Sequence, residues 1–178
     1  MSDFVVDYMV NKKWEIDDFH DRKNKIITTL KTISKKSDIT SKLGGFLLCI
    51  QFEEQLLKEA IQISSNYIKA EIWPSKVDLY VDLNEKTFGS LITYFKHNSI
   101  EFDTKTDLIN LLNIQNKLRN KIVHNIFQAK SLKLIEKDVD RVIEEFDDVV
   151  VMLLNYYDKV CYYLYDLARG VDFSLFVK

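Results

Sequence analysis

Hydrophobic residues recur along most of this chain at the three- and four-residue spacing of an amphipathic α-helix. The spacing covers five segments: about 13–35, 42–71, a short one that starts at Asn84, 106–127, and a last one that starts near 132. The last stripe runs for about 35 residues, which corresponds to ~50 Å of helix. We therefore predict an all-α protein, an up-and-down helical bundle of four to five helices with a long C-terminal helix. Residues 1–178 form a single domain in this prediction.

Polar residues and proline mark where the first helices end. Ser37 and Asp38 interrupt the first stripe, and Thr40 or Ser41 is a candidate cap for the next helix. Trp73-Pro74 ends that helix, because the residue before proline is disfavoured in the helical conformation. Residues 77–83 alternate apolar and polar side chains, but no second segment offers a partner strand, so we expect an extended connector.

Composition supports long helices and a water-soluble protein. The chain holds only four Gly and one Pro, too few for a turn-rich β architecture. Its longest apolar run, Val149–Leu154, is far shorter than a membrane span. The N-terminal residues show no basic segment followed by an apolar run, so we expect no secretory signal, no membrane partner and a cytoplasmic location.

Charge is nearly balanced overall but unevenly distributed. The net charge is −2, which excludes a globally basic nucleic-acid binder. Residues 22–42 carry seven basic side chains and one acid, whereas residues 136–148 carry seven acids and two basic side chains. The two segments are either solvated helix faces of opposite sign or, for the basic one, a functional groove.

Several common kinds of site are missing from the sequence pattern. Cys49 and Cys161 lie in apolar helical surroundings, which predicts buried free thiols. His20, His97 and His124 lack the spacing of metal ligands, and no glycine-rich phosphate loop is present, so we expect no metal and no cofactor. A group of tyrosines in the last helix either stacks on bases or forms core and an oligomer surface: Tyr156, Tyr157, Tyr162, Tyr163 and Tyr165.

Two carboxylates interrupt the apolar stripe of the second helix. Glu53 and Glu54 fill the slot between Ile50 and Leu57. A lone buried charge is costly, so a carboxylate on this face requires a partner, for which Arg119 is the candidate. Either one of the two glutamates supports Arg119 in this way, or both point to the flank of the helix.

The segment Arg119-Asn120-Lys121-Ile122-Val123-His124 is the chain's only Arg-x4-His. Arginine is always charged and can neutralise a phosphate, while histidine titrates near neutral pH and can move a proton. Asn120 and His124 are four residues apart and share a helix face. Lys117 and Lys121 are weaker candidates, as additional positive charge for binding RNA.

This segment resembles the Arg-x(4–6)-His motif of the HEPN superfamily (higher eukaryotes and prokaryotes nucleotide-binding domain). Asn120 matches the polar residue that commonly follows the arginine there. The all-helical pattern, the position of the motif in the penultimate long helix and the long closing helix agree as well. The likeness covers roughly residues 10–170 by pattern and is specific over the six motif residues.

The resemblance implies a metal-independent endoribonuclease of the toxin or phage-defence type, which forms a homodimer with a shared cleft. It implies His124 as general acid and base, Arg119 as stabiliser of the phosphate charge and Asn120 as an RNA-holding residue. An antitoxin or regulatory protein is a further implied partner. One toxin branch has tyrosine two residues after the histidine, where this chain has Ile126. The alternative is a non-catalytic helical dimerisation or binding module.

Overall fold

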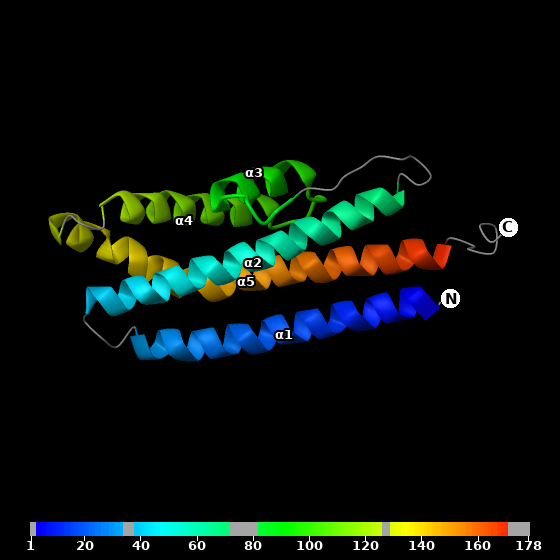
Figure 1. Cartoon of the computed structure of the whole chain (residues 1–178), viewed down its shortest axis with the longest axis horizontal. Coiled ribbons are helices and arrows are strands. Elements are labelled where there is room, and N and C mark those ends of the chain that lie inside the picture. Colours follow the sequence, from blue (N-terminus) through cyan, green and yellow to red (C-terminus); the bar gives the residue numbers. More distant parts are fainter. Residues whose placement is uncertain (1–2, 34–37, 72–81, 126–128, 171–178) are drawn as a thin grey trace.

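The computed structural model describes residues 3–33, 38–71, 82–125 and 129–170, with side chains for 16–33, 38–68, 82–124 and 136–167. Within these ranges the chain is an all-α bundle without strands, as predicted (Figure 1). The bundle consists of α1 (Asp3–Ile33), α2 (Ile39–Glu71), α3 (Phe88–Asn98), α4 (Lys105–Asn125) and α5 (Ala129–Gly170). The expected connector at 77–83 lies outside the described residues except for its last two positions.

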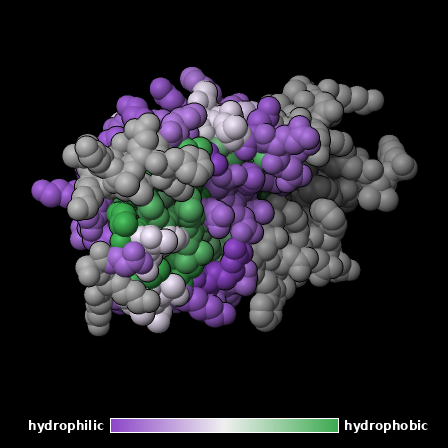
Figure 2. All heavy atoms as spheres, turned by 60° about the vertical axis from the view of Figure 1, so that its left-hand side comes forward, coloured by the Kyte–Doolittle hydropathy of each residue, from purple (hydrophilic) through white to green (hydrophobic). Residues whose placement is uncertain are grey.

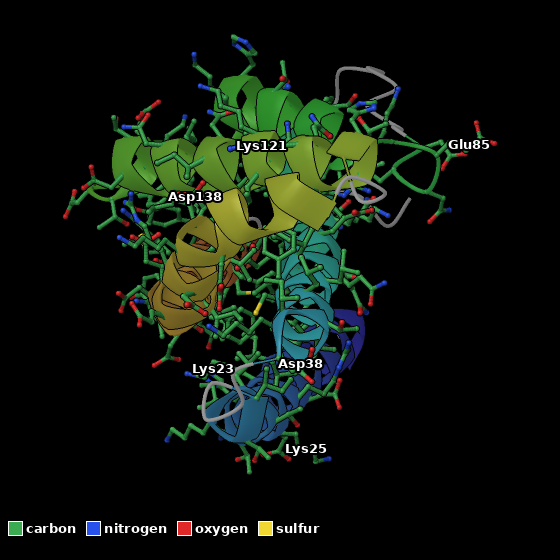
Figure 3. The ribbon with its side chains drawn as sticks, turned by 90° about the vertical axis from the view of Figure 1, so that its left-hand side faces the viewer. Lys23, Lys25, Asp38, Glu85, Lys121 and Asp138 are labelled. Atoms are coloured by element: carbon green, nitrogen blue, oxygen red, sulfur yellow. The ribbon has the colours of Figure 1, made fainter. Side chains whose placement is uncertain are left out.

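The five helices form three layers. α2 and α5 lie side by side in the middle and run in the same direction, with α1 on one side and α3 and α4 on the other (Figures 1 and 3). α1 and α4 run in the opposite direction to the central pair (Figure 1). This arrangement makes α2 and α5 the two helices with most buried surface, and it places α4 on the outside of the bundle.

Helix boundaries differ from the predicted ones mainly at N-termini. Asp38, not Thr40 or Ser41, caps α2: its carboxylate accepts hydrogen bonds from the backbone N–H groups of Thr40 and Ser41, both at 3.1 Å. These contacts and a third from the Ser41 hydroxyl lower the pKa of the Asp38 carboxyl. α3 starts at Phe88 after an N-cap at Thr87, later than the expected start at Asn84.

An aromatic contact joins three helices in the core. The ring of Phe52 in α2 meets Phe19 of α1 and Phe146 of α5 edge-on, with centroids 5.8 and 5.9 Å apart. All three rings are buried, and edge-to-face packing is favourable for aromatic pairs. Phe52 therefore sits at the contact of α1 with the central layer.

The basic and the acidic segments of the sequence pair with each other. Lys42 Nζ lies 2.8 Å from Glu136 and 2.9 Å from Asp140, which joins the start of α2 to α5. Lys23 of α1 lies 2.9 Å from Asp147 of α5. These lysines therefore hold helices together and leave less positive charge for a nucleic-acid groove than their number suggests.

Two contacts fix α3 and α4 in their layer. Gly89 of α3 lies so close to α4 that a Cβ there would stand 2.8 Å from the Asn116 side-chain nitrogen, so this position requires a residue without a side chain. The buried Tyr156 of α5 accepts a hydrogen bond from the Ile100 backbone N–H at 3.1 Å, and its hydroxyl lies 2.6 Å from that of Ser64. Tyr156 thus anchors the connection between α3 and α4 to the central layer.

The end of the bundle where α2 begins exposes apolar surface. Figure 2 brings this end forward and shows hydrophobic residues gathered on it beside hydrophilic ones. Among the described side chains, Leu47 of α2 and Val123 of α4 are exposed to 41% and 58%. No helix in the described part of the chain is long and apolar enough to span a bilayer.

Candidate functional site

α4 carries the motif and turns Arg119, Asn120 and His124 away from the core. Leu118 and Ile122 are buried and hold the helix on the bundle. Successive residues of an α-helix are about 100° apart, so the positions after Leu118 leave the core in turn. Arg119 lies on one flank and is partly exposed, while Asn120 and His124 are exposed on the outer face.

Arg119 points into a polar pocket between α4 and α2. The pocket measures about 640 Å³, and its walls include Gln51, Glu54, Lys58 and Gln62 of α2, together with Asn84 of the segment before α3. Arg119 forms no ion pair or side-chain hydrogen bond with a residue in the described ranges. Its charge is therefore available to a ligand.

Asn120 and His124 share the outer face of α4, as their spacing predicts, but they do not line the pocket of Arg119. Arg119 and His124 are five residues apart, which places them about 140° apart around the helix. Within one chain, α4 therefore directs its arginine and its histidine toward different surroundings. The pocket of one chain therefore does not form the expected single groove, because of the three residues only Arg119 lines it.

Lys117 and Lys121 lie on the opposite flank of α4 from Arg119. Both line a smaller groove between α4 and α5, which also contains Asp138 and Arg141. Figure 3 shows Lys121 on α4 next to Asp138 on α5. Within one chain the two lysines therefore stand apart from Arg119, because two residues along a helix correspond to about 200° around its axis, and their contact with RNA stays a prediction.

Glu53 is the buried carboxylate that the interrupted stripe of α2 predicts. Its side chain has no exposed surface, and Oε1 accepts a hydrogen bond from Gln115 Nε2 of α4 at 3.1 Å. Its other oxygen, Oε2, has no hydrogen-bond partner among the described residues, and the same holds for Oε1 of Gln115. No cation of the described part of the chain neutralises this carboxyl.

Burial raises the pKa of Glu53 well above its ordinary value, and the hydrogen bond from Gln115 opposes this only in part. The thiol of Cys49, one turn earlier on α2, also has a raised pKa because it is buried and faces Glu53. Both cysteines are buried and free, as predicted. A neutral Glu53 acid has one O–H group that can donate a hydrogen bond and avoids the cost of a buried charge without a cation.

Arg119 does not pair with either glutamate as the sequence suggested. Glu53 bonds to Gln115, one turn before Arg119 on α4, and Glu54 forms an ion pair with Lys58 at 3.1 Å. Glu54 does line the same pocket as Arg119. The pairing is wrong by one helical turn, because α4 is rotated so that Gln115 enters the core and Arg119 stays at the pocket rim.

The tyrosines of α5 divide between core and surface. Tyr156 and Tyr157 are buried, while Tyr162 and Tyr163 are exposed to 62% and 37%. The ring of Tyr163 lies 6.0 Å from that of Tyr67 and close to the Lys159 ammonium. Two of the five tyrosines are thus core, Tyr165 is half-buried, and the exposed pair lies further along α5, away from the motif of α4. The described residues contain no group of three or more His, Cys, Asp or Glu placed to hold a metal ion.

Two features of the site were missed from the sequence. Gln115 interrupts the apolar stripe of α4 at a buried position. This interruption is visible in the sequence and indicates a polar contact in the core. The polar stripe of α2 that includes Gln51, Glu54, Lys58 and Gln62 forms a pocket wall only because the segment before α3 and Arg119 stand opposite it. That relationship between distant segments has no local signal.

Comparison of the chain with protein-family models, with curated proteins and with solved structures gave no significant match. The likeness to the HEPN superfamily therefore depends on the motif segment and on the helical pattern described above.

Proposed function

We propose that this protein is a metal-independent endoribonuclease of the toxin or phage-defence type, with Arg119, Asn120 and His124 as its catalytic set. One observation carries the proposal. The side chains of these three residues all reach solvent on α4, and none forms a hydrogen bond or ion pair with a described residue. No polar contact with the described part of the fold occupies them, so their chemistry is available for a substrate.

The reaction requires few groups. His124 takes the proton from a ribose 2′-hydroxyl, and the 2′-oxygen attacks the adjacent phosphorus. The bond from phosphorus to the 5′-oxygen breaks, and this oxygen receives a proton from a histidine. Arg119 stabilises the negative charge that develops on the phosphate oxygens, and Asn120 holds the strand. The products are a 2′,3′-cyclic phosphate and a 5′-hydroxyl.

The proposed active form is a homodimer with RNA bound between two α4 helices. The angle of about 140° between Arg119 and His124 on one helix favours this arrangement, because the histidine of one chain can then face the arginine of the other. Exposed apolar residues on α4, notably Val123, support a contact between chains on this side. An antitoxin or regulatory protein that covers α4 would block this cleft and so inhibit the nuclease.

Expression in a bacterial host tests this function. We expect the wild-type protein to slow growth and degrade cellular RNA, and His124→Ala to relieve both effects. His97→Ala is the matched control, because His97 is also exposed and also lies in the last turn of its helix. Equal growth with wild-type protein and His124→Ala at equal protein levels would count against the proposal.

The second candidate is a non-catalytic dimerisation or binding module. The apolar surface at the end of the bundle where α2 begins favours it, since exposed hydrophobic patches mark contact sites (Figure 2). In this case His124→Ala and Arg119→Ala leave growth, RNA and association unchanged, while Val123→Asp and Leu47→Asp disrupt association.

A further inference from the structure

The pocket beside Arg119 has room for more than a phosphate. Its volume of about 640 Å³ is within the usual range for small-molecule sites. Gln51 and Gln62 stand on the same wall of α2, eleven residues or about 16 Å apart. A single phosphate bound at Arg119 would leave most of this wall without a contact.

Charge in the pocket is arranged so that an anion binds at one place only. Lys58 is neutralised by Glu54 at 3.1 Å, whereas Arg119 has no ion-pair partner in the described ranges. Asp82 adds a carboxylate to the remaining walls. A phosphate is therefore attracted to Arg119 and repelled from the rest of the pocket, which is left for the uncharged part of a ligand.

The remaining walls offer side-chain amides and carboxylate oxygens. Gln51, Gln62 and Asn84 can each donate and accept hydrogen bonds, as a base edge requires. Gln62 uses one N–H toward Asn66 at 3.4 Å, which leaves its carbonyl oxygen as an acceptor. Single-stranded RNA is read through such contacts to base edges, and carboxylates accept from exocyclic amino groups.

We propose that this pocket binds the base of the nucleotide whose phosphate contacts Arg119, and that it selects bases with an exocyclic amino group. Adenine, cytosine and guanine each present an amino donor, which the Asp82 carboxylate can accept. Uracil has no amino group and presents a carbonyl oxygen where cytosine has its amino group, and this oxygen meets the Asp82 carboxylate with like polarity. The inference rests on the proposed function for the choice of RNA, but its test measures binding and needs no cleavage.

Calorimetric titration of the wild-type protein with the four nucleoside 3′-monophosphates tests the preference. We expect the adenosine, cytidine and guanosine compounds to bind at least about fivefold more tightly than the uridine compound, the discrimination that one good base contact supplies. Equal affinity for all four, or tightest binding of the uridine compound, would overturn the inference.

Variants locate the preference. Gln62→Ala and Asn84→Ala should reduce the difference between the four compounds, whereas Arg119→Ala should weaken all four to a similar extent. Asn113→Ala is the control, because Asn113 is an exposed amide on α4 that does not line the pocket. Asn84 and Gln51 are exposed, so variants there keep the fold, and Gln51→Ala replaces Gln62→Ala if the latter lowers the melting temperature. An unchanged preference in these variants would overturn the assignment of the pocket.

The outcomes separate this inference from the proposed function. RNA cleavage that depends on His124, together with no base preference in binding, contradicts the pocket and leaves the function. Selective binding that depends on Gln62 and Asn84, without cleavage of any RNA, contradicts the function and leaves the pocket as a nucleotide site.

Discussion

Gln115 of α4 donates a hydrogen bond to Glu53 of α2 across 3.1 Å in the interior of the bundle. The contact joins the outer helix that carries the motif to the central layer. Gln115 is one turn before Arg119, so the contact fixes the rotation of α4 at the level where Arg119 enters the pocket. The buried carboxyl therefore acts on the site through the helix it holds.

The raised pKa of Glu53 predicts that the protein loses stability as pH rises. Above the ordinary value of 4.5 the unfolded chain has released the Glu53 proton while the folded chain retains it. The folded state then binds more protons, so the free energy of unfolding falls with pH until the folded-state pKa is passed. The slope from this group reaches about 1.4 kcal/mol per pH unit. Chemical denaturation of the wild-type protein at several pH values from about 5 to about 8 measures this slope.

Glu53→Gln should remove this slope, because an amide keeps the shape of the acid and has no proton to release. Glu54→Gln is the control: this neighbouring side chain is partly exposed and paired with Lys58 at the surface of the pocket. A wild-type slope equal to that of Glu53→Gln would show that the buried carboxyl is not neutral in the folded state.

Tyr156→Phe should destabilise the protein through the Ile100 backbone N–H, which loses its acceptor. An unsatisfied buried donor costs about 1–3 kcal/mol, and because the Ile100 N–H is partly buried we expect a loss near the lower end of this range and a fall of a few degrees in melting temperature. The matched control is Tyr162→Phe, since Tyr162 is exposed and its change should have little effect. A Tyr156→Phe protein as stable as the control would contradict the anchoring role of this hydroxyl.

Phe52→Ala should be among the most damaging core substitutions, because Phe52 contacts rings of both α1 and α5. We expect a loss of about 3–5 kcal/mol in the free energy of unfolding. Leu47→Ala on the same helix removes a side chain that is 41% exposed and should cost far less. Denaturant titration of both variants compares them, and similar losses would show that α1 does not depend on Phe52.

The fold could be predicted because each helix buries a regular apolar stripe. The start of α1 could not: the structure begins it at Asp3, ten residues before the predicted start, since no Gly or Pro occurs between residues 3 and 33 to end the helix. The N-cap at Asp38 was missed for a different reason. Asp, Thr and Ser are all good caps, and only the backbone geometry decides among neighbours.

The candidate site was predicted in part. The interrupted stripe of α2 indicated a buried carboxylate, and Glu53 is that residue. Its partner depends on how α4 is rotated against α2, which puts Gln115 rather than Arg119 in the core. The pocket wall facing Arg119 comes from residues more than fifty positions away in α2, so the spacing of the motif gave no indication of it.

RNA cleavage by the purified protein in EDTA tests the central claim most directly, with analysis of the product ends. We expect cleavage that yields 2′,3′-cyclic phosphates and 5′-hydroxyls, that is lost in His124→Ala and Arg119→Ala, and that persists in His97→Ala and Arg141→Ala. Absence of cleavage by the folded wild-type protein across varied RNAs, or cleavage that survives in His124→Ala, would contradict the account.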